Sequence, residues 1–100
     1  MTNDEMWRII KCRIEHFHKR IFKPFGLSED DDIEYVEKLL KRFFHKSRCH
    51  KKWMITFLNK IECVETEIVQ NKTAPKSFKV EISSLLNFVS YGFYYPPGIK

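Results

Sequence analysis

The sequence predicts an all-α fold, a compact bundle of three to four amphipathic helices followed by an extended aromatic C-terminal tail. Apolar residues recur at steps of three and four along most of the chain, which is the period of a helix with one buried face. The segments with this pattern are joined by short polar connections that contain capping residues, glycine or proline. Since 100 residues suit one core and no internal repeat is evident, residues 1–100 are expected to form a single helical domain.

The first helix is expected over residues 3–22. Thr2 and Glu5 have the spacing of a capping box, and acidic residues in the first turn favour the positive end of the helix dipole. The predicted buried face steps by three and four residues: Trp7, Ile10, Ile14, Phe17 and Ile21. Pro24 disfavours helical geometry at the residue before it and Gly26 permits a turn, so the helix should end before this pair.

The second helix is expected over residues 29–46, with Ser28 as its N-cap. The acidic run at residues 29–32 is interpreted as a helix start, because carboxylates stabilise the positive end of the helix dipole. The apolar face continues the same stepping: Ile33, Val36, Leu40 and Phe43.

A third helix is expected over residues 50–70, and its apolar face again steps by three and four: Met54, Phe57, Ile61, Val64 and Ile68. Its start is open, because Ser47 could cap it or the second helix could run on unbroken. A polar connector that contains Pro75 follows it. The alternation of apolar and polar residues from Phe78 onwards is a weak strand signal, but helical spacing fits residues 79–91 better. A fourth helix is therefore expected there, ending before Gly92 and followed by the aromatic tail.

Composition and cysteine content bound the class of protein. The net charge is +5 and the pI is about 9.2, which permits a polyanionic partner without requiring one. Three cysteines and an N-terminus without a secretory signal argue against a disulfide framework. No apolar run approaches the roughly 18 residues that a membrane span needs. We therefore expect an intracellular protein, cytoplasmic or nuclear, without a membrane segment.

The motifs of known enzyme classes are not evident, so we expect a protein that is not an enzyme. None of the three glycines belongs to a phosphate-binding loop, and no nucleophile elbow, kinase motif or His-Glu-x-x-His pair is present. Small helical bundles also rarely provide the deep pocket that catalysis needs. No catalytic residue and no small-molecule substrate is predicted.

Two cysteine–histidine pairs have a spacing that suits a structural zinc ion. Cys12 and His16 are four residues apart on the first expected helix, and His45 and Cys49 are four apart near the end of the second. Residues four apart share a helix face, so the two pairs on facing helices would form a Cys2His2 shell. Cysteine also serves as a small buried hydrophobe, and the more specific Cys-x-x-Cys motif is missing. The leading expectation is therefore no cofactor, with structural zinc as the alternative.

A basic stretch at residues 41–52 holds six Lys or Arg residues and no acid. Its last cations would lie near the start of the third helix, where the helix dipole disfavours them, so a role in attracting phosphate or an acidic partner is favoured. The ordinary alternative is the solvated face of an amphipathic helix. The candidate nucleic-acid-binding residues are Lys41, Arg42, Lys46, Arg48, Lys51 and Lys52.

A second basic group lies on the first expected helix and would extend this footprint if both groups faced the same way. Its members are Lys11, Arg13, Lys19, Arg20 and Lys23.

Aromatic residues make up 15% of the chain, and some apolar residues lie outside the expected buried faces. These further residues include Met6, Ile9, Phe22, Phe25, Leu58 and Val69. An apolar excess of this kind favours a protein partner or self-association, and aromatic residues are enriched at interface centres. Candidate partner-binding anchors are Trp7, Trp53, Phe57, Tyr91, Phe93 and Tyr94, several of which would also suit the core. The predicted function is a helical protein–protein interaction module, an adaptor or assembly domain that includes self-association among its options. The alternative is a nucleic-acid-binding helical domain that uses residues 41–52.

Overall fold

A computed structural model of the chain describes residues 2–46, 50–70 and 76–94, with side chains up to Val89. Within these ranges the predicted all-α bundle is confirmed. Its four α-helices are α1 (Asn3–Phe17), α2 (Asp30–Lys46), α3 (His50–Val69) and α4 (Phe78–Tyr94). A short π-helix, η1 (His18–Phe22), and a 3-10 turn, η2 (Lys23–Phe25), follow α1. No helix among the described residues combines the length and apolar character needed to cross a membrane.

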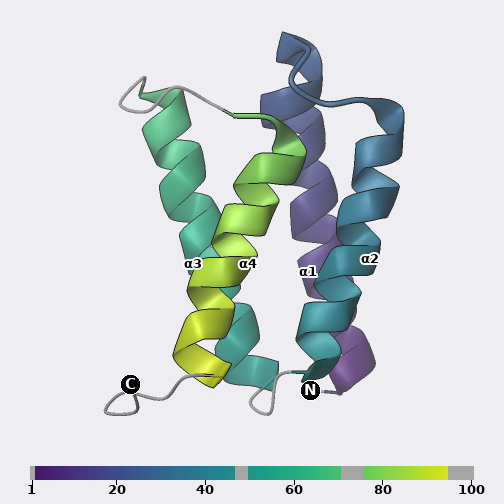
Figure 1. Ribbon diagram of the computed structural model, residues 1–100, viewed down its shortest axis with the longest axis vertical. Helices are drawn as coiled ribbons and strands as arrows, with labels where there is room; N and C mark the ends of the chain where they lie inside the picture. Colours follow the sequence, from purple (N-terminus) through teal and green to yellow (C-terminus); the bar gives the residue numbers. More distant parts are fainter. Residues whose placement is uncertain (1, 47–49, 71–75, 95–100) are drawn as a thin grey trace.

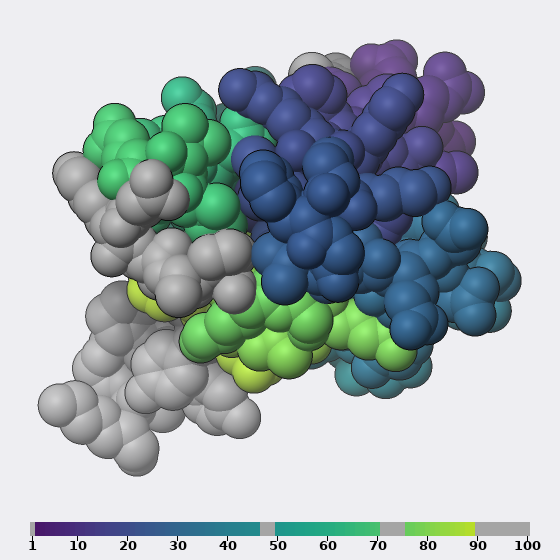
Figure 2. Space-filling view, turned by 90° about the horizontal axis from the view of Figure 1, so that it is seen from above, coloured from purple at the N-terminus to yellow at the C-terminus, as the bar shows by residue number. Residues whose placement is uncertain are grey.

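Successive helices run in opposite directions, so α1 and α3 point the same way, as do α2 and α4 (Figure 1). Helix α1 packs against α2 and α3, and helix α4 packs against the same two helices. The start of α1, the end of α2 and the start of α3 therefore lie at one end of the bundle, called here the lower end (Figure 1). The turn between α1 and α2 and the start of α4 lie at the upper end, which Figure 2 shows face on.

The core is built from the apolar faces of all the helices and is rich in aromatic rings. The largest fully buried aromatic side chains are Trp53, Phe17, Phe22, Phe44, Phe57 and Phe78. Trp53 stacks on Phe57 with ring centroids 5.1 Å apart, and its other neighbour Phe44 lies at 5.8 Å, edge to face. Each fully buried large apolar side chain contributes roughly 1.5–3 kcal/mol, so these rings supply much of the driving force for compaction.

The first helix does not continue as a regular α-helix to residue 22, as the sequence predicted. From His18 it widens into η1, where the N–H of Lys23 donates to the carbonyl of His18, five residues earlier. In this wider turn two consecutive residues, Phe17 and His18, are both buried. Pro24 then has no N–H to continue the helical hydrogen bonds, and Gly26 reverses the chain with a left-handed φ of 71°.

Side-chain hydroxyls cap α1 and α4, whereas the serine hydroxyl that was predicted to cap α2 does not. The Glu5 N–H donates to Thr2 Oγ1 at 3.2 Å, which confirms the predicted cap of α1. Ser28 was the expected cap of α2, yet its buried Oγ has no hydrogen-bond partner among the described residues. Instead Asp32 Oδ2 accepts the N–H of Glu29 at 3.0 Å.

Helix α4 begins one residue earlier and ends later than the sequence predicted. Ser77 Oγ accepts the Val80 N–H at 3.3 Å and so caps the start. The Phe78 N–H donates to the carbonyl of Leu27 at 3.1 Å, which joins α4 to the turn after η2. The helix continues past Gly92 to Tyr94, because one glycine near a helix end costs only about 1 kcal/mol. The predicted tail at residues 95–100 lies outside the described residues.

Candidate functional site

Among the predicted aromatic anchors, two belong to the core. Trp53 and Phe57 are fully buried, because their positions four apart on α3 point into the bundle. They are therefore not available as surface anchors in the folded chain. Trp7 is half-buried and packs against the Phe44 ring at 6.0 Å. The side chains of the other three candidates lie outside the part of the chain whose side chains are described: Tyr91, Phe93 and Tyr94.

An open groove lies at the lower end, between the first turns of α1 and α3. We call it the α1–α3 groove; its volume is about 770 Å³ and Met6 and Ile55 are its main apolar residues. Asn3 also lines it from α1, and Lys51 and Lys52 line it from α3. The groove lies where α1 and α3 start at the same end of the bundle and run side by side in the same direction. Ile55 is 46% exposed, so a large apolar side chain faces solvent here.

His50 lines the α1–α3 groove and is held there by the core. Its ring stacks on the buried Phe44 ring, with centroids 4.6 Å apart and an interplanar angle of 29°. Its Nε2 atom is buried and has no hydrogen-bond partner among the described residues. The first residue of α3 therefore contributes a fixed aromatic wall to the groove.

A second, shallower hollow continues along α1. We call it the α1 hollow; its volume is about 450 Å³, and Ile9, Cys12 and His16 contribute to it together with two arginines, Arg8 and Arg13. Ile9 is 38% exposed and lies three residues after Met6, so the residues that line this hollow come next along α1 after those that line the α1–α3 groove.

The lower end also carries a cluster of exposed cations, called here the basic end. The structure gathers five of the six predicted nucleic-acid-binding residues there: Lys41, Arg42, Lys46, Lys51 and Lys52. The first three lie in the last turns of α2 and the other two in the first turn of α3 (Figure 1). None of them forms an ion pair with a residue of the described ranges. Arg48 lies outside those ranges.

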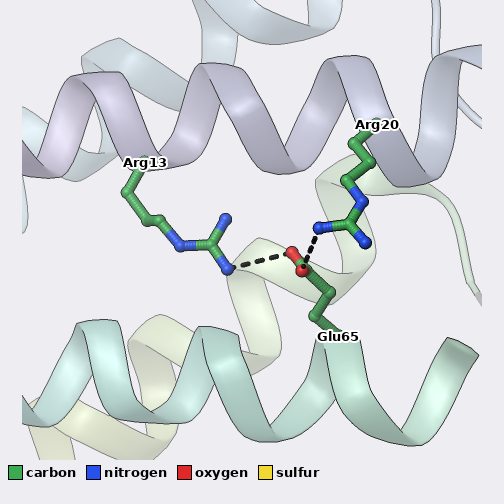
Figure 3. Close-up of polar contacts among 3 residues, drawn as sticks. All are labelled: Arg13, Arg20 and Glu65. Carbon is green, nitrogen blue, oxygen red and sulfur yellow. Dashed lines mark hydrogen bonds and ion pairs between the residues drawn. The ribbon is translucent and has the colours of Figure 1, made fainter.

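The second basic group serves mainly to join helices. Glu65 of α3 binds Arg13 at 2.9 Å and Arg20 at 3.1 Å, so one carboxylate ties α3 to both α1 and η1 (Figure 3). Lys23 binds Asp30 at 2.9 Å, and this hydrogen bond and charge hold the pKa of Asp30 below its ordinary value.

Lys11 of the same group pairs with Glu37 of α2 at 3.8 Å. Since four members of the second group are matched by acids, it does not extend the basic end into one continuous phosphate-binding surface.

The two proposed zinc-ligand pairs are only partly described. Cys12 and His16 are both exposed in the α1 hollow, on the outer face of α1. His45 is exposed beside the Phe44 ring at 5.8 Å, and Cys49 lies outside the described residues. Within the described ranges no three or more His, Cys, Asp or Glu residues gather as metal ligands would. Structural zinc therefore stays an untested prediction.

No protein-family model, curated protein or solved structure matches this chain. The surface is therefore interpreted from its own geometry: an apolar groove with lysines on its edge, continued along α1. Sequence reasoning missed Ile55, although an apolar residue beside the core position Met54 and outside the three-and-four stepping was a usable signal. Burying such residues releases roughly 25 cal/mol per Å², and cations at the edge favour partners with negative charge.

Proposed function

We propose that the chain is a non-catalytic protein–protein interaction module, an adaptor or assembly domain, that binds its partner through the α1–α3 groove and the α1 hollow. The observation that carries this proposal is the exposure of Ile9 and Ile55 in two hollows that α1 lines one after the other along its length. Apolar hollows with polar edges are typical of interaction sites. Protein interfaces likewise combine an apolar centre with a polar rim, which Ile55 and the neighbouring Lys51 and Lys52 would provide.

The test is affinity purification of the tagged chain with nuclease treatment, followed by mass spectrometry. The wild-type chain is expected to retain a set of proteins that the double variant Ile9→Asp/Ile55→Asp loses, because a carboxylate in each hollow opposes burial. The matched control is Val69→Asp/Val80→Asp, which alters two apolar residues near the upper end that are more exposed (57% and 48%) than Ile9 and Ile55 (38% and 46%). Circular dichroism checks that each variant stays folded. Retention of the same proteins by the groove variant would contradict the proposal.

A second candidate function is nucleic-acid binding, which is favoured by the cations of the basic end that have no ion pair within the described ranges. Under this alternative, Arg42→Glu/Lys51→Glu/Lys52→Glu abolishes binding of labelled RNA or DNA and leaves the fold intact, while Ile9→Asp/Ile55→Asp has no effect. Titration of labelled single-stranded and duplex probes at two salt concentrations measures the affinity of each variant for nucleic acid. No binding to the wild-type chain at low salt would exclude the alternative.

A further inference from the structure

We infer that the occupant of the α1–α3 groove and the α1 hollow is an acidic amphipathic helix of a partner protein, about three turns long. This inference rests on the proposed function and adds the chemistry of the partner to it. Three properties of the surface support it: its length, its apolar floor and the sign of the charges beside it.

The length of the surface fits a short helix. The two hollows follow α1 from Met6 to His16. Ten residues of an α-helix span about 15 Å, so a helix of about three turns covers the same distance when it lies along α1. Helices that bind in grooves insert apolar anchors spaced at i, i+3 or i+4, and i+7. Ile9 and Ile55 are the exposed apolar side chains of the two hollows that such anchors would contact.

The floor of the surface does not suit a phosphate backbone. Asn3 and Thr56 also line the groove, but its apolar side chains and Ile9 of the α1 hollow offer no hydrogen-bond donor, and burying phosphate oxygens against them would cost free energy. An apolar helix face gains free energy from the same contact. A protein helix is therefore favoured over a nucleic acid at this position, whatever the basic end binds.

The charges beside the groove select an acidic helix. Lys51 and Lys52 line it without an ion pair to any described residue, and they lie on the first turn of α3, where the helix dipole is also positive. Arg8 adds an exposed cation at the α1 hollow. Glu5 lies one turn before Ile9 on α1. We therefore expect the acids of the occupant to lie over the two lysines rather than over the first turn of α1.

Synthetic peptides test the inference directly with the full chain. The first is a labelled amphipathic peptide of about 14 residues with leucines on one helical face and glutamates elsewhere. The second has lysines in place of the glutamates, and the third has the composition of the first with its leucines spread around the helix. Fluorescence anisotropy at about 50 and about 300 mM salt measures their binding, since screening weakens charge contacts. The first peptide is expected to bind at least about tenfold more tightly than either control, and less tightly at high salt.

Variants of the chain locate the peptide. Ile9→Asp/Ile55→Asp and, separately, Lys51→Glu/Lys52→Glu are each expected to weaken binding of the acidic peptide about tenfold or more. Lys19→Glu/Lys76→Glu removes the same charge near the upper end and is expected to have little effect. Equal affinity for the acidic and basic peptides would overturn the inference. So would an affinity for the acidic peptide that neither Ile9→Asp/Ile55→Asp nor Lys51→Glu/Lys52→Glu lowers.

The outcomes separate this inference from the proposed function. If proteins are captured through Ile9 and Ile55 but the acidic peptide does not bind, the interaction module stands and the acidic helix is wrong. If neither occurs, both fail. A third outcome is that RNA or DNA displaces the acidic peptide and that Lys51→Glu/Lys52→Glu abolishes peptide binding while Ile9→Asp/Ile55→Asp does not. The basic end then binds polyanions in general, and the inference is overturned.

Discussion

Replacement of Glu65 by glutamine should destabilise the bundle by about 2 kcal/mol. Glu65 is the carboxylate that joins Arg13 and Arg20 to α3, and its side chain is only 14% exposed. The two arginines come from 52 and 45 residues away in the sequence, so the substitution acts on the packing of α3 against α1 and η1 (Figure 3).

The magnitude follows from the two contacts. The Arg13–Glu65 bond is 2.9 Å long with Arg13 only 25% exposed, and a hydrogen bond to a charged group in such a setting contributes about 1.5–3 kcal/mol. The Arg20–Glu65 bond is 3.1 Å long with Arg20 56% exposed, so solvent reduces its contribution to about 0.2–1 kcal/mol. Glutamine keeps one acceptor oxygen and recovers part of the loss, which gives about 2 kcal/mol net.

Urea denaturation measures the loss. With a slope of about 1–3 kcal/mol per M, the midpoint for Glu65→Gln should fall by about 0.7–2 M. Double-mutant cycles with Arg13→Gln and Arg20→Gln then apportion it, because the cycle cancels other contacts such as that of Arg13 with the Phe17 ring. The Arg13–Glu65 coupling should exceed the Arg20–Glu65 coupling. A midpoint unchanged in Glu65→Gln, or a larger coupling for Arg20, would refute this reasoning.

Substitutions at three further positions test other parts of the structure. Phe57→Ala should lower the free energy of unfolding by about 3–5 kcal/mol and the thermal midpoint by roughly 15 °C or more. Phe57→Leu should lower the free energy of unfolding by only about 1 kcal/mol. A small effect of the alanine would contradict the core role of this ring. Burial raises the pKa of Glu37 above its ordinary value of 4.5, against the opposing effect of Lys11. The folded state then holds a proton that the unfolded state has lost, so stability falls as the pH rises from 4.5 through the raised pKa, and urea titrations across this window should show Glu37→Gln without that slope. In urea denaturation, Gly26→Ala should lower the free energy of unfolding by about 1 kcal/mol. Backbone strain alone causes this loss, since a new Cβ would meet nothing within 4 Å. Gly26→Asn should lower it less, because asparagine tolerates a positive φ better than alanine.

The helices could be predicted because their signals are local. Thr2 and the acids after it mark the start of α1, and the acidic run at residues 29–32 marks the start of α2, as the structure confirms. Capping and dipole interactions act within one turn, so neighbouring residues suffice to recognise them. The change to a π-helix at His18 was missed. His18 lies there against the Phe78 ring of α4, with ring centroids 4.6 Å apart, and local sequence signals do not reveal a contact between such distant parts of the chain.

The candidate site was only partly predictable. The basic stretch was recognised from its density of charge, and Ile9 was recognised as an apolar residue outside the main face. Trp53 and Phe57 were considered as surface anchors as well as core residues, because an apolar helix face looks the same whether it packs in the core or against a partner. Their burial depends on contacts from other helices, such as that of Phe44 with Trp53.

The sequence by itself determined that the chain forms amphipathic helices, where the first two begin and which residues carry charge, because these properties follow from residues within a few positions of one another. The tertiary structure alone decided which cations are matched and which apolar residues stay exposed. Arg13 is neutralised by a glutamate 52 residues away, whereas Lys51 and Lys52 have no such partner among the described residues. Ile55 stays exposed beside a groove because α1 and α3 run parallel from the same end of the bundle. Both outcomes depend on which helices lie side by side, and that arrangement is a property of the whole packed core.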